Sequence, residues 1–375
     1  MKLSTFLASV ATTAALSAHA QTLTGKAEGF ATGVTGGGDA TPVEPADIDE
    51  LTELLTSDEP QVIILKQEFD YTDSEGTTDG TGCVSFGTGD ACQQQIDTGS
   101  GCGDKDSVPI TYYTAAKTPI DVASNKTIIG VGSAGVIKGK GLRFRDGASN
   151  IIVQNIAITD LNPKYVWGGD ALSFDESDLI WIDHTSLIGR VHYVFGFGAN
   201  SRIELTNNFL NGSTPYSTGC DGYQYWGMEL VGADDTITFK GNYLYKGSGR
   251  SPALSGSTVF HACNNVWEDN NGHALEGNVN GQGLFEGNAF IQIPTITSDR
   301  NWESGQLFTS PDDSTNAKCE EYIGRACVTN VFEDSGAFDY TDTAFMANLT
   351  DLTVAPCGSA SDAKASVPSS AGNTL

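Results

Sequence analysis

The stretch TITFKGNYLYKGSGRSPALSGSTVFHACNNVWEDNNGHALEGNVNGQGLFEGNAF, residues 236–290, repeats one short pattern three times. Two apolar or small residues are separated by one position, and an asparagine follows three positions later. The copies are Ile237/Phe239/Asn242, Phe260/Ala262/Asn265 and Gly283/Phe285/Asn288, and the two steps between them are equal. A fixed step, here of about 23 residues, indicates a repeat architecture.

The pattern continues toward the N-terminus of the chain. It is found at Ile203/Leu205/Asn208 and, with its last position altered, at Leu179/Trp181/His184 and Ile151/Val153/Ile156. The steps between these copies equal or exceed the step found in the first stretch. A recurring base step that is lengthened in places by inserted loops is typical of a solenoid.

Each repeat unit offers a strand of alternating apolar residues that is too short to bury itself. Stacked parallel strands would pair their backbone groups and bury a continuous core, and the asparagines would stack in the turns. We therefore predict an all-β, single-domain, right-handed parallel β-helix. The 44 glycines suit its many turns. The alternatives are a β-sandwich and a β-propeller.

The two ends of the chain have different compositions. PADIDELTELL, residues 45–55, predicts an amphipathic helix that caps the β-helix, and VIILKQEF, residues 62–69, predicts the first strand. We expect the β-helix domain to span residues 21–357. The small, polar segment 358–375 predicts a disordered tail.

Gly130, Gly132 and Gly135 match the GxGxxG pattern of dinucleotide sites. That site needs a helix next, but VIKGKGLRF, residues 136–144, is strand-like and broken by glycine. We interpret the glycines as a β-helix turn.

Residues 1–20 have the features of a secretory signal peptide: Lys2, an apolar run and the small residues of Ala18-His19-Ala20. The mature chain would begin at Gln21, and we expect it to be secreted, extracellular and monomeric. Acceptor sequons at Asn125, Asn211 and Asn348 fit a glycoprotein. No other segment has the roughly 20 apolar residues of a membrane span.

The formal net charge of −27 becomes −28 when Lys2 leaves with the signal peptide. A charge of this sign disfavours nucleic acid and anionic membranes as partners.

Eight cysteines, an even number, indicate disulfides in an exported chain. Their spacing leaves the connectivity open. A zinc site is disfavoured because no CxxC pair occurs.

Chemistry-bearing residues are densest at residues 162–196, which hold five acidic residues followed by Arg190 and His192. Clustered carboxylates in an exported β-helix fit either a Ca²⁺ site or an acid/base pair. Residues 247–256, GSGRSPALSG, place a lone Arg250 in a glycine- and serine-rich turn.

Five motifs in order carry a resemblance to a known family: NPKYVWGGDA (162–171), WIDH (181–184), IGRVHYVFG (188–196), GRSP (249–252) and IGRACV (323–328). With them the chain resembles the fungal-type pectin lyases of the pectate lyase superfamily, from about residue 24 to about residue 350. The family fold is a right-handed parallel β-helix.

The resemblance implies a β-elimination on pectin, which is methyl-esterified homogalacturonan. A base removes the proton at C5 of a galacturonate unit, the C4–O bond breaks, and the developing enolate needs positive charge at the carboxyl group. The catalytic arginine of the family falls on Arg250, as base or as enolate stabiliser, although an arginine is a demanding base because it stays protonated in proteins. Arg190 and Asp170 would act at the uronate carboxyl.

The resemblance also implies that no metal and no other cofactor is bound. In calcium-dependent pectate lyases acidic side chains of this region hold Ca²⁺, whereas in pectin lyases an arginine, here Arg190, takes over that electrostatic role. By family spacing, the cysteines would pair as Cys83–Cys102, Cys92–Cys220 and Cys319–Cys327. Cys263 and Cys357 remain, either paired with each other or with one free.

Sugar rings stack on aromatic faces, and the resemblance assigns this role to Trp167, Tyr225 and Trp226. Phe86 stands where relatives carry a tryptophan, and Gly101 where they carry another. Ala253 occupies a position where relatives commonly have lysine. These departures keep a catalytically weakened, polysaccharide-binding β-helix as an alternative.

Two other enzymes are alternatives on the same fold. A calcium-dependent pectate lyase would use Asp170 as a metal ligand, but further carboxylates are missing near residues 190–195. A polygalacturonase-type hydrolase would use the pair Asp234 and Asp235, which we interpret as a turn before the strand TITFKG.

Overall fold

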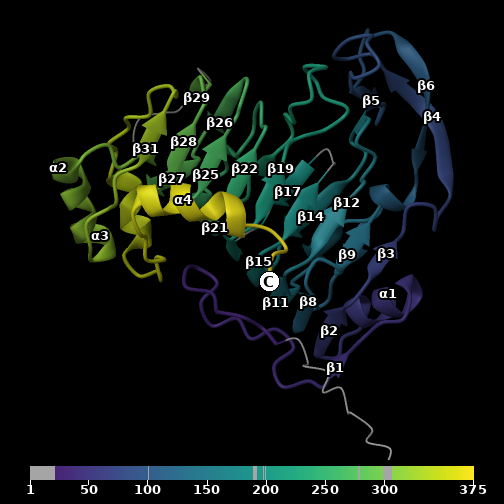
Figure 1. Cartoon of the computed structure of the whole chain (residues 1–375), viewed down its shortest axis with the longest axis horizontal. Helices are drawn as coiled ribbons and strands as arrows, with labels where there is room; N and C mark the ends of the chain where they lie inside the picture. Colours follow the sequence, from purple (N-terminus) through teal and green to yellow (C-terminus); the bar gives the residue numbers. More distant parts are fainter. Residues whose placement is uncertain are drawn as a thin grey trace, which may run out of the picture.

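The computed structural model describes residues 22–99, 101–188, 192–196, 198, 200–277, 279–298 and 306–375, with residues 192–196 described by their backbone alone. The signal peptide expected at residues 1–20 lies outside these residues. Over the described part of the chain, the strands form three long parallel sheets and one small mixed sheet (Figure 1).

Sheet 1 consists of β7 (Ile120–Asp121), β10 (Leu142–Arg145), β14 (Asp170–Asp175), β17 (His192–Gly196), β20 (Met228–Leu230), β23 (Ala253–Leu254), β26 (His273–Gly277) and β29 (Thr295–Thr297). Sheet 2 consists of β1 (Pro42–Val43), β2 (Gln61–Leu65), β8 (Lys126–Gly130), β11 (Ser149–Gln154), β15 (Asp178–Asp183), β18 (Arg202–Thr206), β21 (Thr236–Lys240), β24 (Val259–Cys263), β27 (Gln282–Glu286) and β30 (Leu307–Phe308). Sheet 3 consists of β3 (Glu68–Asp70), β9 (Val136–Lys138), β12 (Ala157–Thr159), β16 (Ser186–Ile188), β19 (Phe209–Asn211), β22 (Tyr243–Tyr245), β25 (Val266–Glu268), β28 (Ala289–Ile291) and β31 (Val331–Glu333). Sheet 4 consists of β4 (Thr77–Cys83), β5 (Gln94–Ile96), β6 (Ser107–Tyr113) and β13 (Tyr165–Val166).

Along most of the chain, consecutive strands enter sheets 1, 2 and 3 in turn, so that one coil contributes one strand to each sheet. β20, β21 and β22 form one such coil, and β23, β24 and β25 form the next. Alternate side chains of the three sheets meet inside in one long apolar core. The predicted right-handed parallel β-helix is confirmed.

Asparagines stack from coil to coil in the turn between sheets 2 and 3. The side-chain Nδ2 of Asn208 donates to Oδ1 of Asn242 at 3.0 Å, Asn242 donates to Asn265 at 3.0 Å, and Asn265 donates to Asn288 at 2.9 Å. Each of these three donors is buried and also donates to a backbone carbonyl, so the amides satisfy one another inside the protein. The predicted ladder is confirmed. It continues to Asn330, which the sequence pattern did not predict because a long loop precedes this residue.

The predicted repeat unit Leu179/Trp181/His184 is wrong by one residue. Ile151 pairs with Ile180, and Val153 with Ile182, so Leu179 and Trp181 do not belong to the interior row. Because a shift of one residue turns a strand's side chains to the opposite face, Trp181 packs outside sheet 2 against the N-terminal segment. The sequence DLIWID of β15 carries apolar residues on both faces, so its pattern does not show which face points into the core.

Helix α1 (Ile48–Thr56) confirms the expected N-terminal helix. The side chain of Asp47 accepts hydrogen bonds from the backbone N–H groups of Asp49 and Glu50, and Leu51 and Leu55 are buried against β2 and β7. The segment 62–69 forms two strands, β2 and β3, and β1 precedes them, so the expectation that it is the first strand is wrong. Gly130–Gly135 form a turn between β8 and β9, as interpreted.

The prediction that residues 358–375 form a disordered tail is wrong. Residues 360–370 form α4 (Ala360–Ser370), which lies across sheet 3 (Figure 1, yellow). Ala363 and Val367 of α4, and Ala371 directly after it, pack on Val266 and Ala289. The side chain of Asn155 then accepts a hydrogen bond from the last backbone N–H of the chain at 2.9 Å. A stripe of small side chains is enough to dock this helix, although the segment is polar on average.

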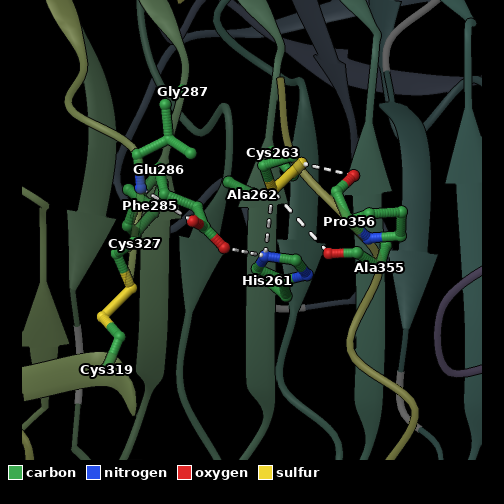
Figure 2. Close-up of polar contacts among 12 residues, drawn as sticks. His261, Ala262, Cys263, Phe285, Glu286, Gly287, Cys319, Cys327, Ala355 and Pro356 are labelled. Atoms are coloured by element: carbon green, nitrogen blue, oxygen red, sulfur yellow. Dashed lines mark hydrogen bonds and ion pairs between the residues drawn. A yellow bond between two sulfur atoms is a disulfide. The ribbon is translucent and has the colours of Figure 1, made fainter. Parts of the chain in front are cut away.

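Four disulfides link the described cysteines: Cys83–Cys102, Cys92–Cys220, Cys263–Cys357 and Cys319–Cys327. The three expected pairs are confirmed, and the two remaining cysteines pair with each other. Figure 2 shows the Cys263 disulfide beside His261 and Glu286 on sheet 2, where the C-terminal segment crosses the β-helix.

Short helices α2 (Asp313–Asn316), η2 (Ala317–Cys319), α3 (Glu320–Ile323) and η3 (Ala344–Leu349) lie in the C-terminal segment, and η1 (Ala115–Lys117) precedes β7. Among the described residues, every helix is too short or too polar to cross a membrane.

Candidate active site

Arg250 lies in the turn between β22 and β23, on the outer face of sheet 1. Its backbone has a φ of +47°, in the left-handed region. A Cβ atom at the preceding Gly249 would come within 2.5 Å of the Tyr225 ring, so only glycine allows that ring to lie against the turn. The glycine-rich sequence around Arg250 therefore serves to place an aromatic ring beside it.

The guanidinium of Arg250 lies between two carboxylates and two aromatic rings. Its Nη1 is 2.9 Å from Oε2 of Glu229, and its Nε is 3.4 Å from Oε2 of Glu276. The Arg250 Cζ is 5.0 Å from the ring centroid of Trp226 and 5.8 Å from that of Tyr225. The side chain remains 23% exposed, so a ligand can reach it. Arg250, Glu229, Glu276, His273, Tyr225 and Trp226 are called the arginine cluster below.

Glu276 is the most buried carboxylate of the arginine cluster. Its Oε1 accepts hydrogen bonds from the Tyr225 hydroxyl and from Nε2 of His273, the latter at 2.7 Å. Burial alone would raise the pKa of Glu276, but the hydrogen bonds from His273 and Tyr225 and the charge of Arg250 lower it. Burial and the Glu276 carboxylate raise the pKa of the Tyr225 hydroxyl to about 12. The carboxylate is therefore held in its charged form.

The two glutamates come from strands that flank β23. Glu229 of β20 pairs in register with Ala253 of β23, and Ala253 pairs with Glu276 of β26. Met228 and Leu230, on either side of Glu229, point into the core. The β-alternation thus turns both glutamates to the outer face, with the small Ala253 side chain between them.

Phe86 and Trp226 bring the loop of sheet 4 to the arginine cluster. Their ring centroids are 6.2 Å apart in an edge arrangement, and Trp226 Nε1 donates to Oε1 of Gln93 at 3.1 Å. The Cys92–Cys220 disulfide joins the two loops. The structure thus brings together four predicted residues, Arg250, Tyr225, Trp226 and Phe86.

Asp170 and Trp167 are both neighbours of Lys117. Asp170 begins β14. Burial of Lys117 lowers the pKa of its ammonium group, and the negative charge of the neighbouring Asp170 partly opposes this effect. Lys117 donates to the backbone carbonyl of Trp167, a residue that is 37% exposed.

Ser173 of β14 and Ala253 of β23 belong to one row of register partners in sheet 1. In the sequence, Asp170 and Arg250 each stand three positions before this row. The strands β14 and β23 are three strand spacings apart, about 14 Å. The predicted Arg190, two positions before β17 in the sequence, lies outside the described residues.

A calcium site needs several oxygen ligands at one point. Among the described residues, Asp170 belongs to no group of three or more acidic, histidine or cysteine side chains that are close enough to share an ion. In the described chain, the one group of three or more histidine, cysteine or acidic side chains that are close enough to share a metal ion is His261, Cys263 and Cys357. There the two sulfurs already form a disulfide.

Two other features lie away from the arginine cluster. Asp235 is buried at the turn before β21, where its Oδ1 accepts from the Ser201 backbone N–H at 2.9 Å, so it has a structural partner. A hollow of about 450 Å³ lies between sheet 4 and the loop after β12, lined by Tyr112, Tyr165 and Tyr216 among others. None of the arginine cluster lines it.

Glu229, Glu276, His273 and Lys117 were not predicted from the sequence. A signal for the glutamates was present, because Glu229, Ala253 and Glu276 follow one another at the base step of the repeat, to within one position. Residues at the base step stack on the same face in a solenoid. The sequence carries no comparable signal for Lys117.

The fold is shared with known pectate lyases. The profile of the family described as "Pectate lyase" matches residues 102–197. A pectate lyase from Bacillus sp. N165, solved in complex with trigalacturonate, superimposes with a TM-score of 0.60 at 20% identity, over 92% of this chain and 98% of that one. A pectate lyase bound to a hexasaccharide superimposes with a TM-score of 0.60 at 14% identity, over 93% of this chain and 97% of that one. These likenesses show that the chain shares the parallel β-helix fold of known pectate lyases.

Curated proteins of high identity show the family to which the chain belongs. The chain is 61% identical to the probable pectin lyase C of Emericella nidulans over 95% of this chain and 96% of that protein. It is 60% identical to the probable pectin lyase A of Aspergillus flavus, over 94% of both chains. It is 51% identical to pectin lyase A of Emericella nidulans, over 99% of both chains. The chain belongs to the pectin lyase family.

Proposed function

We propose that this lyase cleaves methyl-esterified homogalacturonan endo-wise by β-elimination, with Arg250 as the catalytic residue. The observation that carries the proposal is the Arg250 guanidinium itself, partly exposed between two carboxylates and flanked by the rings of Tyr225 and Trp226. The rings offer apolar faces to sugar units beside a fixed positive charge.

The reaction needs a proton acceptor at C5 and positive charge at the carboxyl group. The base removes the C5 proton, the electron pair forms the C4–C5 double bond, and the C4–O bond breaks with the leaving oxygen taking up a proton. A guanidinium stays charged in proteins and donates hydrogen bonds. Of the two roles expected for Arg250, this favours stabilisation of the enolate. Arg190 and Asp170 are proposed to act at the uronate carboxyl, and Trp167 and Phe86 to contact sugar rings.

A methyl ester suits the charge of the chain. An esterified uronate is neutral, whereas a free uronate would meet a protein of formal net charge −27 and the partly exposed carboxylate of Glu229. We further propose that the protein is exported by its signal peptide and acts outside the cell as a monomer. The exposed Asn348 is the sequon that we expect to carry a glycan.

The test is an ultraviolet assay for the unsaturated product. Purified protein is mixed with highly methylated pectin or with polygalacturonate, each with chelator or with added Ca²⁺. We expect product from methylated pectin, unaffected by chelator. Product from polygalacturonate only, and only with Ca²⁺, would overturn the proposal in favour of a pectate lyase. No product from either polymer would favour a binding protein.

A further inference from the structure

Glu276 contacts three members of the arginine cluster through one carboxylate. Oε1 takes the hydrogen bonds of Tyr225 and His273, and Oε2 faces Nε of Arg250 at 3.4 Å. The Glu276 side chain is 11% exposed, about half the exposure of Arg250, so it lies behind the guanidinium rather than beside the solvent. A group in this position acts on a ligand through Arg250.

An arginine held at a single nitrogen can still rotate. Nη1 donates a hydrogen bond to Glu229 Oε2 at 2.9 Å, whereas the buried Nε makes no hydrogen bond and faces Glu276 Oε2 at 3.4 Å as an ion pair. Because the guanidinium is a rigid planar fork, a hydrogen bond at one nitrogen and a charge facing another together favour one orientation of its plane. The Tyr225 and Trp226 rings lie next to that plane.

The partners of Glu276 hold the carboxylate itself. Tyr225 and His273 come from different elements, the loop before β20 and the start of β26. Both bonds point to the same oxygen, which leaves Oε2 directed at Arg250. The chain from His273 through Glu276 to Arg250 is therefore continuous.

We propose that Glu276 is a positioning residue, which together with His273 and Tyr225 fixes the plane of the Arg250 guanidinium toward the substrate carboxyl group. The proposal rests on the proposed function, because it assigns the orientation of the arginine that carries it. The proposal assigns a role to two further residues, Glu276 and His273, which affect the reaction by orienting Arg250 and do not contact the substrate.

The main test is Glu276→Gln, which keeps the shape of the side chain and its bond from Tyr225 but removes the charge facing Arg250. We expect kcat on methylated pectin to fall about 10- to 100-fold with little change in KM, because small misplacements of a catalytic group cost rates of this order. His273→Ala should act in the same direction, and His273→Gln, which can still donate to Glu276, should recover part of the loss.

A matched control exists on sheet 3. Glu268 Oε2 accepts from the Tyr243 hydroxyl at 2.8 Å, so Glu268→Gln changes the same kind of tyrosine–glutamate pair away from the arginine cluster. We expect Glu268→Gln to leave kcat and KM unchanged. Equal losses of kcat in both variants would overturn the proposal.

Chemical rescue separates positioning from a purely structural role. In Arg250→Ala, added methylguanidinium should bind in the space beside Glu229 and Glu276 and restore part of the activity. The double variant Arg250→Ala/Glu276→Gln should show rescue weaker by about tenfold or more. Rescue that is equal in both variants would overturn the proposal.

Failure of the proposal and failure of the proposed function give different results. If Arg250→Ala is inactive and Glu276→Gln has wild-type kcat, the positioning role is wrong and the function stands. If Arg250→Ala keeps full activity, the catalytic assignment itself fails. If Glu276→Gln does not fold, the comparison of His273→Ala with His273→Gln decides, and equal kcat values in that pair would overturn the role.

Discussion

Two clusters in this molecule use the same three residue types for different ends. In the arginine cluster, Glu276 faces Arg250 and His273. On sheet 2, Glu286 faces Arg325 and His261 (Figure 2 shows Glu286 and His261).

The clusters differ in burial and in the number of bonds. Glu286 and His261 are fully buried, and both oxygens of Glu286 bind the Arg325 guanidinium, at 2.7 and 2.8 Å. Glu286 Oε2 also accepts from the Val328 backbone N–H at 3.0 Å, so the carboxylate is saturated and fixes the C-terminal segment to sheet 2. In the arginine cluster each contact of Arg250 is single. The two arginines are similarly exposed, 23% for Arg250 and 29% for Arg325, so the clusters differ in the burial of the glutamate and in the number of bonds to the guanidinium.

The comparison shows how one ion pair becomes structural and another becomes available to ligands. A buried ion pair stabilises only when its hydrogen bonds are complete, and removing one partner then leaves an uncompensated charge. A partly exposed arginine with single contacts keeps donors free for an incoming carboxyl group. The predictions below test this division of roles.

The largest expected effect is on activity in the arginine cluster. Arg250→Ala should lower kcat/KM on methylated pectin about 1,000-fold, because a charge aimed at the developing enolate is lost. The thermal midpoint should change less than in Arg325→Ala. Ultraviolet absorbance of the unsaturated product and thermal denaturation measure the two quantities on the same preparation.

The second effect is on stability in the sheet 2 cluster. Arg325→Ala should lower the free energy of unfolding by about 3 kcal/mol, since it leaves the Glu286 carboxylate buried without its partner. Turnover by the folded fraction should stay at the wild-type level. Urea denaturation and initial rates test this, and a large loss of kcat with unchanged stability would contradict the division of roles.

The third effect is on the free energy of unfolding at acidic pH. Burial alone would raise the pKa of Glu286, but Arg325 and His261 lower it from 4.5 to about 2. A carboxyl group with a lowered folded-state pKa stabilises the protein above its unfolded-state pKa, and this stability is lost as the pH falls through the folded-state pKa. Between pH 7 and pH 3, the wild type should lose about 2 kcal/mol through this group that Glu286→Gln does not lose. Urea titrations of both proteins across this range measure the difference, and parallel curves would argue against the pair.

The smallest effect sharpens the description of the arginine cluster. In Ala253→Lys the new ammonium would lie in the row between Glu229 and Glu276. The rate on partly de-esterified pectin, relative to highly methylated pectin, should rise by about fivefold at most, as expected for a half-exposed charge. Ala253→Met controls for side-chain length, and an equal rise in both variants would exclude a charge effect.

The repeat made much of the fold predictable. Asn208, Asn242, Asn265 and Asn288 stand in a pattern that only stacked coils satisfy, so the ladder and the register between them followed from the sequence. The unit at Leu179 was misaligned because both faces of its strand are apolar. Helix α4 was missed because its docking stripe consists of alanines and one valine, which average composition does not distinguish from a polar tail.

The candidate site was predictable to a different degree. Arg250, Tyr225 and Trp226 came from resemblance, and the structure places them in contact. Glu286 and Arg325 are 39 positions apart and share no motif, so their pairing depends on the path of the C-terminal segment across sheet 2. Such contacts follow from tertiary structure and leave no local pattern in the sequence.

The in-register row of Glu229, Ala253 and Glu276 has a consequence for how this fold can diversify. Between neighbouring coils the backbone register is fixed by the sheets, while the turn loops vary in length, as the unequal steps of the repeat show. Loops can therefore lengthen, shorten or change sequence without displacing the row that supports the arginine. In such a scaffold, substrate preference can evolve in the loops while the chemistry of the row is inherited intact.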